Sequence, residues 1–279
     1  MEKRITPEEL SGFRAYLIAQ ERSEGTIEKY IRDLTGLARW LAGREVCGEL
    51  MTQWKAYLCQ CYAPVTVNAI LSAANTFFNF VGWSDCRLKF LKIQRKLFRE
   101  SSRQLTREEY IRLLASSRQQ GSERLPLLLE TMGSTGVRVS EVRYITVEAA
   151  YTGRVEISMK GKIRTVLLPE KLCRKLLKYA KKQKITSGEI FLTRSGKSMS
   201  RGQIWAQMKA LCAVANVAPT KVFPHNLRHL FAVTFYKSCR DIAGLASVLG
   251  HSSIETTRIY LLTDSAQYRR RLNALGLIL

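Results

Sequence analysis

A helix-start signature occurs near residue 6 and again near residue 106, and this repetition divides the chain. Thr6-Pro7-Glu8-Glu9 offers a Thr as N-cap, a Pro at the first helical position and a Glu at the third. Thr106-Arg107-Glu108-Glu109 repeats the N-cap and third-position pair. The stretch before it, residues 93–104, is polar and basic with little apolar period, which is typical of a linker. Because 279 residues suffice for two medium domains, we expect one at 1–92, a linker at 93–104 and a second at 105–279.

The first domain is expected to be a small helical bundle. Apolar residues recur with helical period after Thr6, over 27–41 and over 64–81, and a shorter helix is expected over 52–61. Pro64 suits the first position of the last of these helices.

The second domain mixes helices with short strands. We expect helices over 107–116 and 125–132, and another beginning near Val139. Residues 144–148, 153–159 and 162–168 are rich in β-branched side chains and separated by glycine-containing turns, which predicts strands. A basic helix should follow Pro169, a capped helix should follow Ser200, and the chain after Pro224 should be nearly all helical. The predicted fold class is therefore mainly α with a small antiparallel β-sheet.

The charge balance points to a polyanionic partner. Lys and Arg number 45 against 23 Asp and Glu, which gives a net charge of +22 at pH 7. Such an excess attracts polyanions, of which nucleic acid is the commonest. A solvated basic surface without a partner is the alternative, and a charge this large makes it the weaker one.

The sequence gives no sign of secretion or of a membrane span. The charged start MEKRITPEEL lacks the apolar segment of a signal peptide, and no apolar run approaches the ~18 residues of a spanning helix. The 7 cysteines are scattered without a CxxC pair, which favours reduced thiols in a cytoplasmic protein.

All 3 histidines lie close to one arginine in the sequence. His225, Arg228 and His229 share PHNLRHLFAVTF, and His251 follows in LGHSS. One interpretation is a zinc site, because His225 and His229 share a helix face and His251 would complete three ligands. Against it, no Glu follows His225 as in HExxH, and Arg228 would place a cation beside the metal. The other interpretation is a phosphate site, since histidine and arginine both donate to non-bridging oxygens.

The order of the motifs makes the phosphate interpretation specific. TGVRVSE, then MKGK before a strand, then HNLRHLFA and then LGHSSIETTRIY follow one another along the second domain. In this order they resemble the tyrosine recombinase (phage integrase) family over roughly residues 105–279. The helical first domain is similar, less specifically, to that family's SAM-like core-binding domain. The length of the chain resembles the short, Xer-like or mobile-element members.

The resemblance implies a role for each matching residue. Arg138 would bind the scissile phosphate together with His225 and Arg228, the H-x-x-R pair. His251 would be the second histidine, and Tyr260 the nucleophile. Lys160, with Lys162 as the alternative lysine, would protonate the leaving 5′-oxygen, and Glu141 would orient the site from behind it. The expected catalytic set is Arg138, Lys160, His225, Arg228, His251 and Tyr260. His229 is usual at its position but is not expected to be catalytic.

The chemistry of strand cleavage agrees with these roles. A tyrosine, with a reference pKa near ~10, needs nearby cations and a proton acceptor to attack a phosphodiester. Two arginines and a histidine would stabilise the negative charge that develops on the phosphoryl oxygens. The product would be a 3′-phosphotyrosine, and the reaction implies no metal and no other cofactor. Taken singly, each residue also has an ordinary structural explanation, such as an ion pair between Arg138 and Glu141.

The resemblance further implies double-stranded DNA as partner and a homo- or hetero-tetramer in a synaptic complex. The apolar end LGLIL would either dock into a neighbouring protomer or pack on its own domain. Integration, excision, inversion and dimer resolution all remain open. Two alternatives within DNA chemistry are a type IB topoisomerase-like relaxing enzyme and a non-catalytic DNA-binding regulator.

Overall fold

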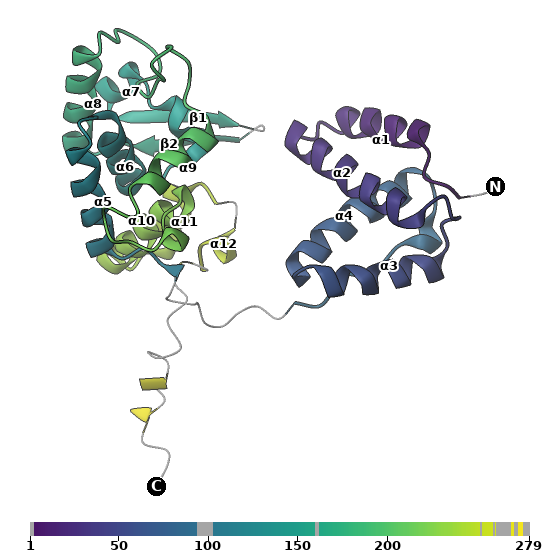
Figure 1. Ribbon diagram of the computed structural model, residues 1–279. Coiled ribbons are helices and arrows are strands. Elements are labelled where there is room, and N and C mark those ends of the chain that lie inside the picture. The colour runs from purple at the N-terminus through teal and green to yellow at the C-terminus, as the bar shows by residue number, and fades with distance from the viewer. Residues whose placement is uncertain are drawn as a thin grey trace. The chain divides into compact units, whose positions relative to one another are not determined.

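The computed structural model describes residues 3–93, 103–159, 162–251, 253–258, 260, 269–270 and 273–275. The chain divides into two compact units, residues 1–95 and 96–279 (Figure 1). This division falls inside the predicted linker, although the bounds of the domains and of the linker stay predictions.

Unit 1 is a helical bundle, as the sequence predicts. Its elements are α1 (Pro7–Ala19), α2 (Glu24–Leu41), α3 (Gly48–Cys61), α4 (Pro64–Phe80) and the short 3-10 helix η1 (Ser84–Cys86). The predicted capping box is present, since the Glu9 amide donates to Thr6 Oγ1 at 3.2 Å and the Thr6 amide donates to the Glu9 carboxylate at 3.1 Å. Phe13 and Phe77 meet edge-on in the buried core.

Unit 2 carries most of the helices. They are α5 (Arg107–Gln119), α6 (Arg124–Thr135), α7 (Val147–Thr152), α8 (Glu170–Lys182), α9 (Arg201–Ala210), α10 (Pro224–Cys239), α11 (Ile242–Leu249) and α12 (Ile254–Arg258), with 3-10 helices η3 (Val139–Tyr144) and η4 (Pro219–Lys221). Helix α6 packs against α5, α8 and α10, so it lies at the centre of the unit (Figure 1). Capping boxes at Thr106 and Ser200 start α5 and α9 where the sequence predicts them.

A two-stranded antiparallel sheet projects from unit 2. Strand β1 (Arg154–Met159) pairs with β2 (Lys162–Leu167), with Val155 opposite Val166 and Met159 opposite Lys162. Alternation sends Val155, Ile157 and Val166 into the core. The prediction of strands over 153–159 and 162–168 is therefore confirmed, as is a fold class of mainly helices with a small sheet.

The strand predicted over residues 144–148 is wrong. Residues up to Tyr144 belong to η3, and Val147 begins α7. Between them, the Thr146 side chain accepts a hydrogen bond from the Ala149 amide at 3.1 Å and acts as an N-cap. The β-branched residues that suggest a strand here are therefore a helix N-cap, Thr146, and the buried first residue of the helix, Val147. The only strand-like pairing within residues 144–148 is an isolated bridge from Thr146 to Glu189.

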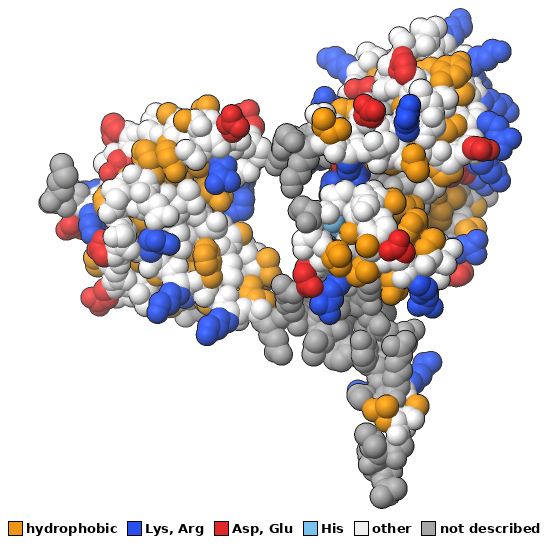
Figure 2. All heavy atoms as spheres, turned by 180° about the vertical axis from the view of Figure 1, so that it is seen from behind, with side chains coloured by type: hydrophobic (Ala, Val, Ile, Leu, Met, Phe, Trp, Pro, Cys, Tyr) orange, Lys and Arg blue, Asp and Glu red, His pale blue; other side chains and the backbone are white. Residues whose placement is uncertain are grey.

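The surface agrees with the net charge. Lys and Arg side chains lie over both units on the face shown in Figure 2. Across the described part of the chain, none of the helices has both the length and the apolar character needed to cross a membrane.

Candidate active site

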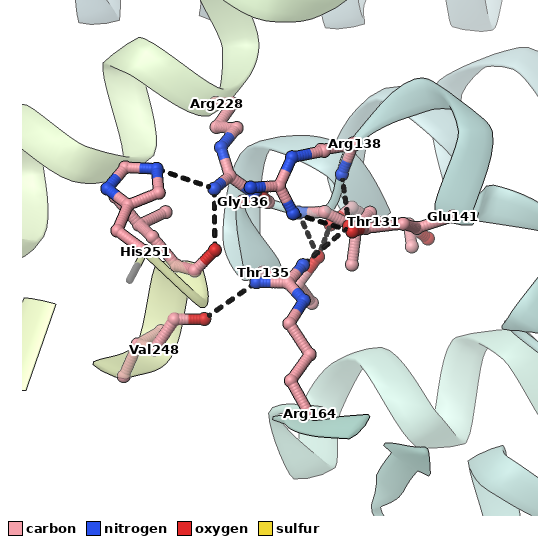
Figure 3. Close-up of polar contacts among 11 residues, drawn as sticks. Thr131, Thr135, Gly136, Arg138, Glu141, Arg164, Arg228, Val248 and His251 are labelled. Carbon is pink, nitrogen blue, oxygen red and sulfur yellow. Dashed lines mark hydrogen bonds and ion pairs between the residues drawn. The ribbon is translucent and has the colours of Figure 1, made fainter. Parts of the chain in front are cut away.

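Arg228 is the anchor of the site. It lies on α10, one turn after Pro224, and only 2% of its surface is exposed. Its Nη1 donates to the Gly136 carbonyl at 2.6 Å, and its Nη2 donates to the Leu249 carbonyl at 2.6 Å (Figure 3). One guanidinium thus joins α10, the end of α6 and the end of α11. Burial and the positive charge of Arg138 lower the pKa of Arg228 to about 10, and its interaction with Tyr260 opposes that shift.

Gly136 makes the turn that presents the next arginine. It ends α6 with φ +64°, in the left-handed region that favours glycine. A Cβ at this position would also lie 2.5 Å from Cδ1 of Phe231, so the turn is closely packed against α10. Arg138 follows at once and starts η3.

Arg138 and Glu141 form a hydrogen-bonded pair at the start of η3. The Arg138 amide donates to Glu141 Oε2 at 2.7 Å, and Arg138 Nη1 donates to Oε1 at 2.8 Å. The Arg138 side chain remains 43% exposed, whereas Glu141 is buried. Burial alone would raise the pKa of Glu141, but these hydrogen bonds and the nearby arginines lower it. Glu141 is therefore a carboxylate that holds Arg138 and leaves its guanidinium accessible.

The hydrogen bonds of His251 fix its tautomer. Arg228 Nη2 lies 3.1 Å from His251 Nε2, and because an arginine only donates, Nε2 is the acceptor. Nδ1 then carries the proton and donates to Thr257 Oγ1 at 2.8 Å. Burial, followed by the charge of Arg228 and of the other arginines, lowers the pKa of His251 to about 4. His251 is consequently neutral at physiological pH.

Tyr260 lies among the three histidines. It is 4% exposed and its ring is stacked on His251, with centroids 5.8 Å apart and planes 9° apart. His229 meets the ring edge-on at 5.4 Å, and His225 lies at 6.3 Å. Residues far apart in the sequence are thus gathered around the phenol.

The structure brings most of the predicted site together. Arg138, Glu141, His225, Arg228, His251 and Tyr260 all belong to this one cluster. Lys160 lies outside the described residues, and Lys162 begins β2. The catalytic roles assigned to the clustered residues and to both lysines stay predictions.

One residue of the cluster, Arg164, is missed by the sequence analysis. It lies on β2, and its Nη2 forms an ion pair with Glu141. Its Nη1 donates to the Val248 carbonyl at 3.1 Å (Figure 3). The alternation of the strand could have revealed Arg164 in the sequence. Arg164 lies two residues before the buried Val166, so both side chains lie on the same inward face of β2.

The described residues include no group of three or more His, Cys, Asp or Glu side chains placed to hold a metal ion.

Comparisons with known proteins find relatives in sequence and in fold. The model of the phage integrase family matches residues 103–267. The tyrosine recombinase XerD of Xanthomonas axonopodis pv. citri (strain 306) is 31% identical over 277 residues, covering 89% of this chain and 90% of the relative. The crystal structure of the XerH site-specific recombinase bound to difH substrate, a pre-cleavage complex, has a TM-score of 0.70 at 17% identity and covers 95% of this chain and 84% of that one. A lambda integrase tetramer bound to a Holliday junction has a TM-score of 0.72 at 14% identity, over 91% of this chain and 76% of that one.

Proposed function

The chain belongs to the phage integrase family of tyrosine recombinases, and we propose that it recombines DNA at specific sites through a 3′-phosphotyrosine intermediate. The observation that carries the proposal is the position of Tyr260, stacked on the neutral His251 and interacting with Arg228. A phenol in that position is next to the cations that a scissile phosphate requires. Integration, excision, inversion and dimer resolution all use this chemistry.

Phosphate binding is the first step of the proposed mechanism. Arg138 and Arg228 donate to the non-bridging oxygens, with His225 beside them on the first turn of α10. Because Arg228 is held by two carbonyls, its charge is already in place before DNA arrives, and no reorganisation is needed as charge develops.

Tyr260 then attacks the phosphorus. A Tyr Oη–P bond forms, the bond from phosphorus to the 5′-oxygen breaks, and a histidine of the site accepts the phenolic proton. The one lone pair of the neutral His251 ring is on Nε2 and already accepts from Arg228 Nη2. His251 therefore takes the phenolic proton only when that hydrogen bond opens. Lys160 or Lys162 protonates the leaving 5′-oxygen. Attack by a second 5′-hydroxyl reverses these bonds and reseals the strand.

Covalent trapping tests the proposal. The protein, in a buffer that contains a chelator, is mixed with duplexes that carry candidate sites and a nick near the cleavage point. Cleavage then releases a short 5′-hydroxyl fragment that diffuses away, so the covalent adduct accumulates. We expect a protease-sensitive shifted band on a denaturing gel for the wild type and none for Tyr260→Phe. Tyr151→Phe is the matched control, because Tyr151 is exposed on α7. An adduct that persists in Tyr260→Phe, or a wild type that binds a site and gives none, would overturn the mechanism.

The wider arrangement is also part of the proposal. Residues 1–92 would bind DNA as the core-binding domain and residues 105–279 would cut it. Recombination of two duplexes needs four strand cleavages, which favours a homo- or hetero-tetramer, and a lambda integrase tetramer bound to a Holliday junction shares the fold. We place this activity in the cytoplasm.

A further inference from the structure

Arg164 holds two parts of the site that are distant in sequence. It forms its ion pair with Glu141 on η3 and donates to the carbonyl of Val248 on α11. Glu141 in turn holds Arg138, and Val248 lies three residues before His251. The Arg164 side chain therefore connects Glu141, which holds Arg138, to the turn that carries His251.

The packing of Arg164 against that turn is close. Gly250, between Val248 and His251, has φ +63°, and a Cβ there would collide with Cδ of Arg164. The Arg164 side chain is 13% exposed. Its position is thus determined by contacts on both sides.

Stability alone does not explain an arginine in this place. Its Nε is buried and finds no hydrogen-bond partner among the residues that the structure describes. Burial of an unpaired N–H costs free energy, and an apolar side chain on the inner face of β2 would avoid that cost. Because Arg164 is present despite this free-energy cost, its effect on the neighbouring charges is the better explanation for it.

The charge balance supplies such an effect. The Glu141 carboxylate is shared, since Oε1 accepts from Arg138 and Oε2 accepts from both the Arg138 amide and Arg164. If Arg164 were neutral, the negative charge of Glu141 would act on Arg138 alone. The positive potential at the scissile phosphate would then fall, although no phosphate contact had been removed.

We propose that Arg164 is a positioning residue for strand cleavage, because its charge balances Glu141 and so leaves the positive potential of Arg138 available to the phosphate. The proposal rests on the recombinase function. Arg164 acts through Glu141, which in turn holds Arg138.

The test compares cleavage of two substrates by Arg164→Gln. One is an ordinary phosphodiester at the cleavage position, and the other is a methylphosphonate, in which a neutral methyl group replaces one non-bridging oxygen. We expect Arg164→Gln to form the covalent adduct about 10- to 100-fold more slowly than the wild type on the phosphodiester. The loss should be several-fold smaller on the methylphosphonate, because that linkage is neutral and its transition state carries one negative charge fewer to stabilise. Arg164→Lys, which keeps the charge, should recover part of the phosphodiester rate.

A second variant tests the route through Glu141. If Arg164 acts by balancing that carboxylate, the double variant Arg164→Gln/Glu141→Gln should be no slower than the slower single variant. Arg154→Gln, which removes an exposed arginine from β1 of the same hairpin, should match the wild type. Thermal unfolding shows whether each variant is folded. If Arg164→Gln does not fold, the comparison of the two substrates is made with Arg164→Lys.

The outcomes separate the inference from the function. If the wild type forms the adduct and Arg164→Gln forms it at the same rate, the inference about Arg164 is wrong and the recombinase function stands. Equal losses on both substrates, additive with Glu141→Gln, also overturn it and leave an ordinary packing role. A wild type that forms no adduct overturns the recombinase function together with the inference.

Discussion

At the scale of single residues, the sequence predicts which motif residues cluster better than it predicts the residue that supports them. Arg138, Arg228 and Tyr260 lie in motifs whose order is distinctive, and the structure brings them together. Arg164 lies in a strand pattern where an inward-facing arginine is visible, but its partner Glu141 is distant in sequence. A tertiary ion pair of this kind cannot be read from spacing along one element.

His251 makes stability depend on pH. Its pKa falls from 6.5 to about 4 on folding, so between these pH values the unfolded chain binds the proton that the folded chain does not. Its contribution to stability is present above pH 6.5 and is lost as the pH falls toward 4. We expect urea unfolding to show a larger loss of stability from pH 7.5 to pH 5 in the wild type than in His251→Gln. Other titrating groups are common to both proteins, so equal losses would contradict the assignment.

At the scale of elements, helix caps are predictable and residues next to caps are not. Thr6, Thr106 and Ser200 start helices as their patterns indicate. Thr146 also caps a helix, but its β-branched neighbours imitate a strand in the sequence. The two-stranded sheet is predictable because the period of two is unbroken along both β1 and β2.

A Gly→Ala substitution should have opposite effects on stability at Gly250, in the turn after α11, and at Gly36, inside α2. Gly250→Ala should lower the free energy of unfolding by about 1–2 kcal/mol or more, because Ala resists the left-handed region and its Cβ meets Arg164. Gly36→Ala is the control, since Gly36 lies inside α2 with nothing within 4 Å of a Cβ. That substitution should raise stability by about 0.5–1 kcal/mol. Denaturant titration measures both, and a neutral Gly250→Ala would refute the strained turn.

At the scale of the whole molecule, the net charge of +22 sets how DNA binding responds to salt. A protein that neutralises several phosphates releases counterions, so its affinity falls steeply as salt rises. We expect the affinity for a site-bearing duplex to fall at least about 10³-fold between 50 and 200 mM salt. Fluorescence anisotropy measures it, with sucrose at matched osmolality as the control for water activity. A flat response would show that phosphate contacts contribute little to affinity.

The two units keep separate cores. Among the described residues, the aromatic core around Phe13 and Phe77 belongs to unit 1, whereas Arg228 and its carbonyl partners belong to unit 2. Substitutions on the surface of unit 1 therefore act on a different folding unit from the one that contains Arg228. For protein engineering, this separation predicts that the surface of unit 1 can be redesigned without disturbing the packing around Arg228 in unit 2.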